Sequence, residues 1–127
     1  MKYCILIFWV MFAYTLSGQI NKSSTPFTEQ QKIDYLIKCV EDLKNAKFDR
    51  NGTLHEAQAA GAHLKMKREK AGNAIKTVDD FIYKVASKSS TTGYDYKIIY
   101  DSGVEMSAKD FYLKCLKDLE LKTSIDY

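Results

Sequence analysis

Residues 48–67 read F-D-R-N-G-T-L-H-E-A-Q-A-A-G-A-H-L-K-M-K, and this stretch decides the fold. The short alternating segment 48–50 predicts a β-strand, and 53–55 predicts its return strand. Asn51-Gly52 stands between them, and both residue types tolerate positive φ, which favours a tight type I′ hairpin turn. Residues 56 to about 70 are rich in alanine and predict a helix. The stretch therefore predicts a β-hairpin followed directly by a helix.

A second stretch near the C-terminus repeats this order. Residues 94–100 alternate in the way of a strand, residues 101–106 predict a turn and a return strand, and a helix is expected over 108–122. Aligning Gly52 with Gly103 brings strand, turn, return strand and helix start into register. We therefore expect two hairpin–helix units whose hairpins share one small antiparallel sheet.

Two further helices are predicted by their starts and by their apolar spacing. Thr28 with Gln31, and Thr77 with Asp80, form capping boxes at the starts of helices expected over 28–45 and 77–87. The predicted fold class is therefore α+β, with about four helices packed on a small antiparallel sheet made of two short hairpins. We expect a single domain over 28–122 and a frayed tail over 123–127.

The first 18 residues differ in kind from the rest of the chain. A basic start is followed by an uncharged apolar run of about 14 residues and then by Ser17-Gly18. A transmembrane helix needs ~20 such residues, so the pattern favours a cleaved signal peptide over a retained membrane anchor. Residues 19–27 predict a flexible lead-in. We therefore expect a periplasmic or secreted protein with no stable membrane anchor after signal cleavage.

Composition excludes several classes of protein. Charged residues make up 28% of the chain and apolar residues 46%, which excludes a disordered chain. The net charge of +3 is spread along the sequence and does not indicate a nucleic-acid-binding protein. No pattern of metal ligands or cofactor motif is present, so neither a metal nor a cofactor is predicted.

Two cysteines remain after the predicted signal peptide, Cys39 and Cys115. Both lie on apolar helical stripes, Cys115 at the centre of its stripe and Cys39 at the edge. A free cysteine packs well as a small apolar residue, whereas two cysteines in an exported protein can also pair. The sequence leaves both interpretations open.

Several motifs resemble the YfeK-like family of small exported bacterial proteins, over about residues 28–117. They are Phe48-x-Arg50-Asn51-Gly52, Ala59-Ala60-x-x-His63-Leu64-x-x-Lys67, Ile75-x-Thr77-x-x-Asp80-Phe81-Ile82 and Ala86-Ser87-x-Ser89-Ser90-x-x-Gly93-x-x-Tyr96. The resemblance implies a signal peptide and an extracytoplasmic location, and no known activity. Asp49 stands where the resemblance implies an apolar residue.

One set of polar residues is a candidate binding patch. His63 and Lys67 are four residues apart, so they share one face of the predicted helix. The hairpin turn precedes that helix, and a hydroxyl-rich loop follows the next one. The patch would hold a polar or anionic ligand through charge and hydrogen bonds. Its predicted members are Arg50, Asn51, His63, Lys67, Ser87, Ser89 and Ser90.

Three interpretations of His63 compete. It could be a buried structural residue bonded to loop backbone or to a serine hydroxyl, since buried polar groups are satisfied. It could be the centre of a patch that binds an unidentified envelope ligand or protein. It could also act with Ser89 or Ser90 in a small hydrolase or transferase, although no nucleophile elbow or orienting third residue is evident. The sequence favours a non-enzymatic binding module.

Overall fold

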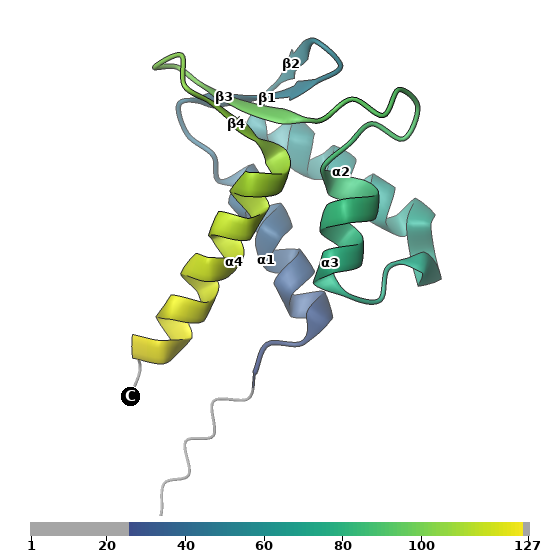
Figure 1. Cartoon of the computed structure of the whole chain (residues 1–127), viewed down its shortest axis with the longest axis vertical. Coiled ribbons are helices and arrows are strands. Elements are labelled where there is room, and N and C mark those ends of the chain that lie inside the picture. Colours follow the sequence, from purple (N-terminus) through teal and green to yellow (C-terminus); the bar gives the residue numbers. More distant parts are fainter. Residues whose placement is uncertain (1–25, 126–127) are drawn as a thin grey trace, which may run out of the picture.

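The computed structural model describes residues 26–125. The predicted signal peptide (1–18) and nearly all of the lead-in (19–27) lie outside the described residues, so these two assignments remain predictions. Figure 1 shows a small sheet at one end of the molecule, with the helices gathered on one side of it. The predicted α+β fold, with helices on a sheet of two hairpins, is confirmed.

The helices and strands follow the expected order along the chain. Their bounds are α1 Glu29–Glu41, β1 Ala46–Arg50, β2 Thr53–His55, α2 Ala57–Ala71, η1 Gly72–Ala74, α3 Val78–Asp80, η2 Phe81–Ala86, β3 Lys97–Tyr100, β4 Glu105–Ser107 and α4 Ala108–Ile125. The first helix is shorter than expected, and α4 continues past the expected end at residue 122.

The two hairpins share one antiparallel sheet with strand order β2-β1-β3-β4. β1 and β3 form the central pair, in which Phe48 lies opposite Ile98. The short strands β2 and β4 are the edges, and short edge strands offer little backbone for unwanted pairing. The repeated hairpin–helix order expected from the alignment of Gly52 with Gly103 is thus present in the structure.

The first hairpin turn has the backbone that its sequence requires. Asn51 and Gly52 have φ values of 56° and 81°, as a type I′ turn needs. The Oδ1 atom of Asp49 accepts a hydrogen bond from the Gly52 amide at 2.9 Å. Phe48 next to it is 1% exposed. Asp49 therefore does not prevent burial of this strand, because its side chain lies on the other face and caps the turn.

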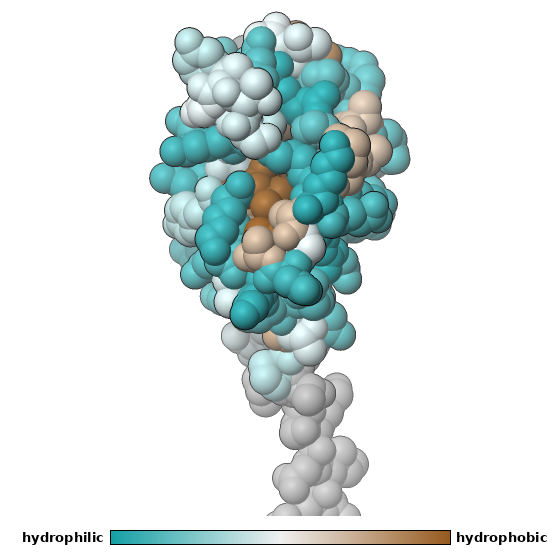
Figure 2. Space-filling model, turned by 90° about the vertical axis from the view of Figure 1, so that its right-hand side faces the viewer, coloured by the Kyte–Doolittle hydropathy of each residue, from teal (hydrophilic) through white to brown (hydrophobic). Residues whose placement is uncertain are grey.

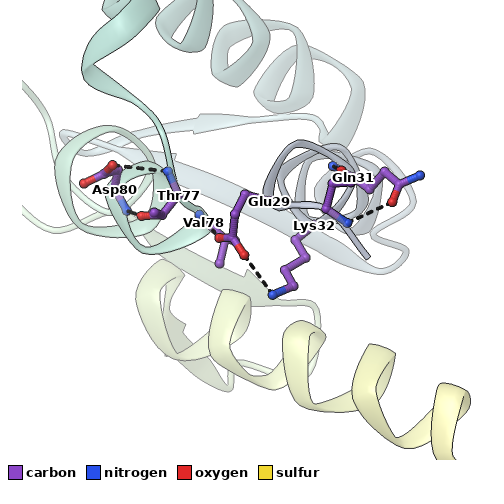
Figure 3. Close-up of polar contacts among 7 residues, drawn as sticks. Glu29, Gln31, Lys32, Thr77, Val78 and Asp80 are labelled. Carbon is purple, nitrogen blue, oxygen red and sulfur yellow. Dashed lines mark hydrogen bonds and ion pairs between the residues drawn. The ribbon is translucent and has the colours of Figure 1, made fainter. Parts of the chain in front are cut away.

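Two of the helix starts face each other (Figure 3). Both predicted capping boxes are present, at Thr28 for α1 and at Thr77 for α3. Glu29 of α1 links the two starts, because its Oε2 accepts from the Val78 amide at 2.8 Å while its Oε1 accepts from Lys32 Nζ at 2.9 Å. The first turn of α3 is therefore held by a carboxylate from another helix.

One hydrophobic core lies between the sheet and the helices. α1 contributes Ile33, Leu36, Ile37 and Val40 at helical spacing, all of them buried. α4 contributes Tyr112, whose hydroxyl donates to the Ala86 carbonyl at 3.3 Å. The ring of Phe48 packs edge-on against that of Tyr96, with centroids 5.6 Å apart. Tyr96 precedes β3 instead of lying inside it, and Tyr94 is exposed. The observed strand is therefore shorter than the strand over 94–100 that the tyrosine alternation predicts.

The third helical segment differs most from expectation. Its first turn is α-helical, but η2 continues as a π-helix. Gly61 lies in α2 where this helix packs against α1. A Cβ atom there would meet the side chain of Glu41 in α1, which is paired with Lys65. The glycine therefore makes room for the partly buried carboxylate of an ion pair between α1 and α2.

The surface on the side of α2 and η1 is mostly hydrophilic. Figure 2 shows one small apolar patch on this side, framed by hydrophilic side chains. Among the helices of residues 26–125, none combines the length and apolar character needed to cross a membrane.

Candidate functional site

A pocket of about 490 Å³ opens between the first hairpin, α2 and the loop that follows η2. We call it the basic pocket. Its lining residues come from three separate parts of the chain: Arg50, Asn51, Thr53, His55, His63, Met66, Lys67, Lys70, Ser89, Ser90, Thr91 and Tyr96. They include one arginine, two lysines, two histidines and several hydroxyls, and no carboxylate. Such a lining favours an anion over a cation.

The structure brings six of the seven predicted patch residues together in this pocket. They are Arg50, Asn51, His63, Lys67, Ser89 and Ser90. Ser87 lies elsewhere: it is 4% exposed, its hydroxyl has no hydrogen-bond partner within the described residues, and it faces a second hollow of about 250 Å³. Three of the six, Asn51, Ser89 and Lys67, have structural contacts that limit what they can offer a ligand.

Asn51 and Ser89 fasten the loop to the hairpin. Asn51 Nδ2 donates to Ser89 Oγ at 3.2 Å, and Thr92 Oγ1 donates to Asn51 Oδ1 at 2.8 Å. Ser89 Oγ also accepts from the amides of Thr91 and Thr92, at 3.3 and 3.2 Å. Ser89 is 6% exposed. These two side chains therefore shape the pocket wall, and their polar atoms are largely occupied.

Lys67 caps the end of the π-helix. Its ammonium donates to the carbonyls of Val85 and Lys88, the latter at 2.9 Å, and to the hydroxyl of Tyr96 at 3.3 Å. It also lies 4.9 Å from the centroid of the Tyr96 ring. An ammonium has three protons, and Lys67 has three acceptors. Lys67 thus adds positive charge to the pocket but has no proton left to donate to a ligand.

Arg50 ends β1 and points across the hairpin to His55 of β2. Its Nη2 lies 3.1 Å from His55 Nε2. The pKa of His55 is lowered by burial and then by the Arg50 charge. The Nε atom of Arg50 is buried and has no hydrogen-bond partner within residues 26–125. The guanidinium therefore retains unused donor capacity.

His63 lies in the pocket wall and is half-buried. Its pKa is lowered from 6.5 to about 4, first by burial and then by the positive charges of Arg50 and Lys67, with smaller contributions from His55 and Lys70. In the part of the chain that the structure describes, His63 makes no hydrogen bond, to loop backbone or to a serine. His63 is therefore a neutral imidazole at pH 7 in a strongly positive environment.

Residues 27–120 match a family described as a family of unknown function (DUF5329). The chain belongs to this family. It is also 38% identical over 68 residues to the uncharacterized protein YfeK of Salmonella typhimurium. That alignment covers 54% of this chain and 57% of the relative, so the chain matches little more than half of YfeK. No solved structure matches.

The resemblance to the YfeK-like family drawn from the motifs is thus confirmed. All four motifs lie within the residues that match DUF5329. Their side chains are divided between the core and the basic pocket. Leu64, Phe81 and Ile82 are fully buried, whereas Arg50, His63 and Ser90 line the pocket. The DUF5329 motifs therefore include residues that shape the fold and residues that face the pocket.

Six lining residues of this DUF5329 chain were not predicted from the sequence: Thr53, His55, Met66, Lys70, Thr91 and Tyr96. Helical spacing could have found two of them, because Met66 and Lys70 continue the face of His63 and Lys67 at i+3 and i+7. Strand alternation could have found His55, which shares a face with Thr53. No local signal places Tyr96 or Thr91, because loop contacts position both.

The structure of this DUF5329 protein gives no support to the hydrolase alternative. Ser89 is buried, and three donors already occupy its oxygen. Ser90 is exposed, and neither serine is hydrogen-bonded to His63 among the described residues. A serine nucleophile needs an adjacent base with an orienting partner, and no carboxylate lines the pocket to orient His63. Within residues 26–125, no group of three His, Cys, Asp or Glu could hold a metal.

Proposed function

We propose that this chain is a non-enzymatic binding module that holds an anionic group, such as a phosphate or a carboxylate, in the basic pocket. The observation that carries the proposal is the lining itself, which combines five basic side chains with hydroxyls and contains no carboxylate. Positive charges gathered without a counter-ion repel one another, and a bound anion removes that repulsion.

The contacts within the pocket divide its basic residues into two groups. Lys67 is occupied by the loop, so it contributes charge alone. Arg50 lines the pocket, and its guanidinium contacts only His55 among the described residues, while Lys70 is exposed with no ion pair there. Ser90 is exposed at the pocket wall. The ligand-contacting groups in this proposal are therefore Arg50 and Lys70, with Ser90 and His63 as secondary partners.

The proposal places the module outside the cytoplasm, in the periplasm or secreted. It rests there on the pattern of residues 1–18, which has the layout of a signal peptide. An extracytoplasmic ligand or partner protein that presents an anionic group would then be the natural occupant of the pocket.

Titration of the protein with inorganic phosphate, followed by amide NMR shifts at constant ionic strength, tests the proposal. Shifts should appear in the hairpin 50–55, in α2 and in the loop 88–92. Lys70→Gln should weaken binding by about ten- to a hundredfold, because a hydrogen bond to a charged group contributes about 1.5–3 kcal/mol. Lys117→Gln removes the same charge from an exposed position on α4 and should leave binding unchanged.

Two results would contradict the proposal. One is equal weakening by Lys70→Gln and Lys117→Gln, which would show a diffuse charge effect instead of a site. The other is the absence of saturable shifts with phosphate, with pyrophosphate and with a dicarboxylate such as succinate.

A further inference from the structure

The second hollow, which Ser87 faces, lies where the end of η2, the loop 87–96 and the start of α4 meet. Its volume is about 250 Å³. Backbone hydrogen bonds hold the three segments together. The Tyr96 amide donates to the Ser87 carbonyl, and the Ala108 amide donates to the Tyr96 carbonyl, both at 2.9 Å. The walls of this hollow are therefore fixed by the fold, as the walls of ligand pockets usually are.

A buried hydroxyl without a partner forms part of this hollow. Ser87 is 4% exposed, and its Oγ atom makes no hydrogen bond within the described residues. Buried polar groups in proteins are nearly always hydrogen-bonded, because an unpaired one has left water and gained nothing in return. Since Ser87 lines the hollow, a molecule bound there can supply the missing partner.

Four charged side chains of both signs line the same hollow. Lys88 and Asp95 are β-bridge partners in the loop, and Lys109 and Asp110 lie in the first turn of α4. All four are exposed, and none of them forms an ion pair within residues 26–125. A ligand that carries both signs of charge complements such a lining, whereas a simple anion or cation is repelled by half of it.

We propose that this mixed-charge hollow binds a small zwitterion of amino-acid size. The two aspartates accept hydrogen bonds from the ligand ammonium, and the two lysines donate to its carboxylate. The Ser87 hydroxyl supplies one further hydrogen bond to the ligand. The volume sets the size, because pockets for drug-sized ligands measure about 300–1,000 Å³ and this hollow measures about 250 Å³.

This inference does not rest on the anion site proposed for the basic pocket. Tyr96 is the residue that lines both hollows, and its hydroxyl accepts from Lys67 of the basic pocket. The charged side chains of the two linings are different residues. A zwitterion has no net charge, so its binding here and phosphate binding in the basic pocket succeed or fail separately.

Titration with L-alanine and with 4-aminobutyrate, followed by amide NMR shifts at constant ionic strength, tests the proposal with two separations of the ligand charges. Saturable shifts should appear in 87–88, 95–96 and 107–110 with at least one of the two. Ethylamine and propionate each carry one of the two charged groups of L-alanine. Each should bind at least about tenfold more weakly than the zwitterion, because it loses the hydrogen bonds of one charged group.

Substitutions in the lining separate the site from a general effect of surface charge. Ser87→Ala should weaken binding of the zwitterion about tenfold and leave the thermal midpoint unchanged or higher, because no protein group loses a partner. Lys109→Gln and Asp110→Asn should each weaken binding to a similar degree. Lys117→Gln and Asp118→Asn are the matched controls, since they make the same charge changes at exposed positions further along α4, and they should leave binding unchanged.

Four results would overturn the proposal. The first is the absence of saturable shifts with both zwitterions, and the second is equally tight binding of ethylamine or propionate. The third is equal weakening by the α4 variants and their matched controls. The fourth is a fall of about 5 °C or more in the thermal midpoint of Ser87→Ala, which would show that the hydroxyl serves the fold.

Discussion

Lys67→Met is the substitution that best separates the structure of the basic pocket from its charge. Lys67 holds the carbonyls of Val85 and Lys88 and the hydroxyl of Tyr96. Methionine keeps the unbranched apolar part of the side chain, lacks the ammonium at its end, and so removes all three hydrogen bonds. A buried acceptor left without a partner costs about 1–3 kcal/mol. Relief of the partial burial of the ammonium, which lowers the Lys67 pKa, offsets part of that cost.

We therefore expect Lys67→Met to lower the free energy of unfolding by about 2 kcal/mol in urea. Lys70→Met is the matched control, because it removes the same charge from the same helix and pocket at an exposed position. It should change stability by less than about 0.5 kcal/mol. Hydrogen exchange gives a local check, since the amides of Ser89 and Tyr96 should lose protection in Lys67→Met. Equal stabilities of the two variants would refute the reasoning.

Three further predictions concern the pocket wall and the packing of α2. The imidazole of His63 should titrate near pH 4 by NMR, and phosphate should raise its pKa. Because the unfolded chain binds this proton below about pH 6.5 and the folded chain only below about 4, the free energy of unfolding should increase as pH rises from 4 to 6.5, by about 1 kcal/mol in an open pocket. His63→Gln should abolish this increase. Asn51→Gly should cost about 1 kcal/mol in urea through the lost bond to Ser89, and Asn51→Ala about 1 kcal/mol more because alanine disfavours positive φ; equal costs would contradict this. Gly61→Val should cost about 2 kcal/mol by displacing Glu41, and unchanged stability would show that α1 and α2 can separate freely.

The hairpins and helix starts were predictable because their causes are local. Asn51-Gly52 demands a backbone that few other pairs adopt, and the structure shows that backbone. Thr28 and Thr77 each bond to an amide three residues away, so their capping boxes need no distant partner. The apolar spacing of α1 likewise placed its buried face correctly.

The sequence predicted which residues line the candidate site better than it predicted what each of them does there. Sequence spacing indicated that the turn, the helix face and the serine loop converge, and six of the seven expected residues do line one pocket. Which of them are free for a ligand depends on atoms far apart along the chain. Lys67 is occupied by the carbonyls of Val85, in the last turn of η2, and of Lys88 after it, while Ser87 lines a different hollow.

By itself, the sequence determined the order of elements, both hairpin turns, the capped helix starts and the apolar faces. These features depend on backbone preferences and on neighbours within four residues. Only the tertiary structure decided that Lys67 caps a π-helix, that His63 stays neutral, and that Asn51 bonds to Ser89 across the pocket wall. The reason is physical: burial and through-space charge depend on how distant segments pack, and no local pattern in the chain encodes either.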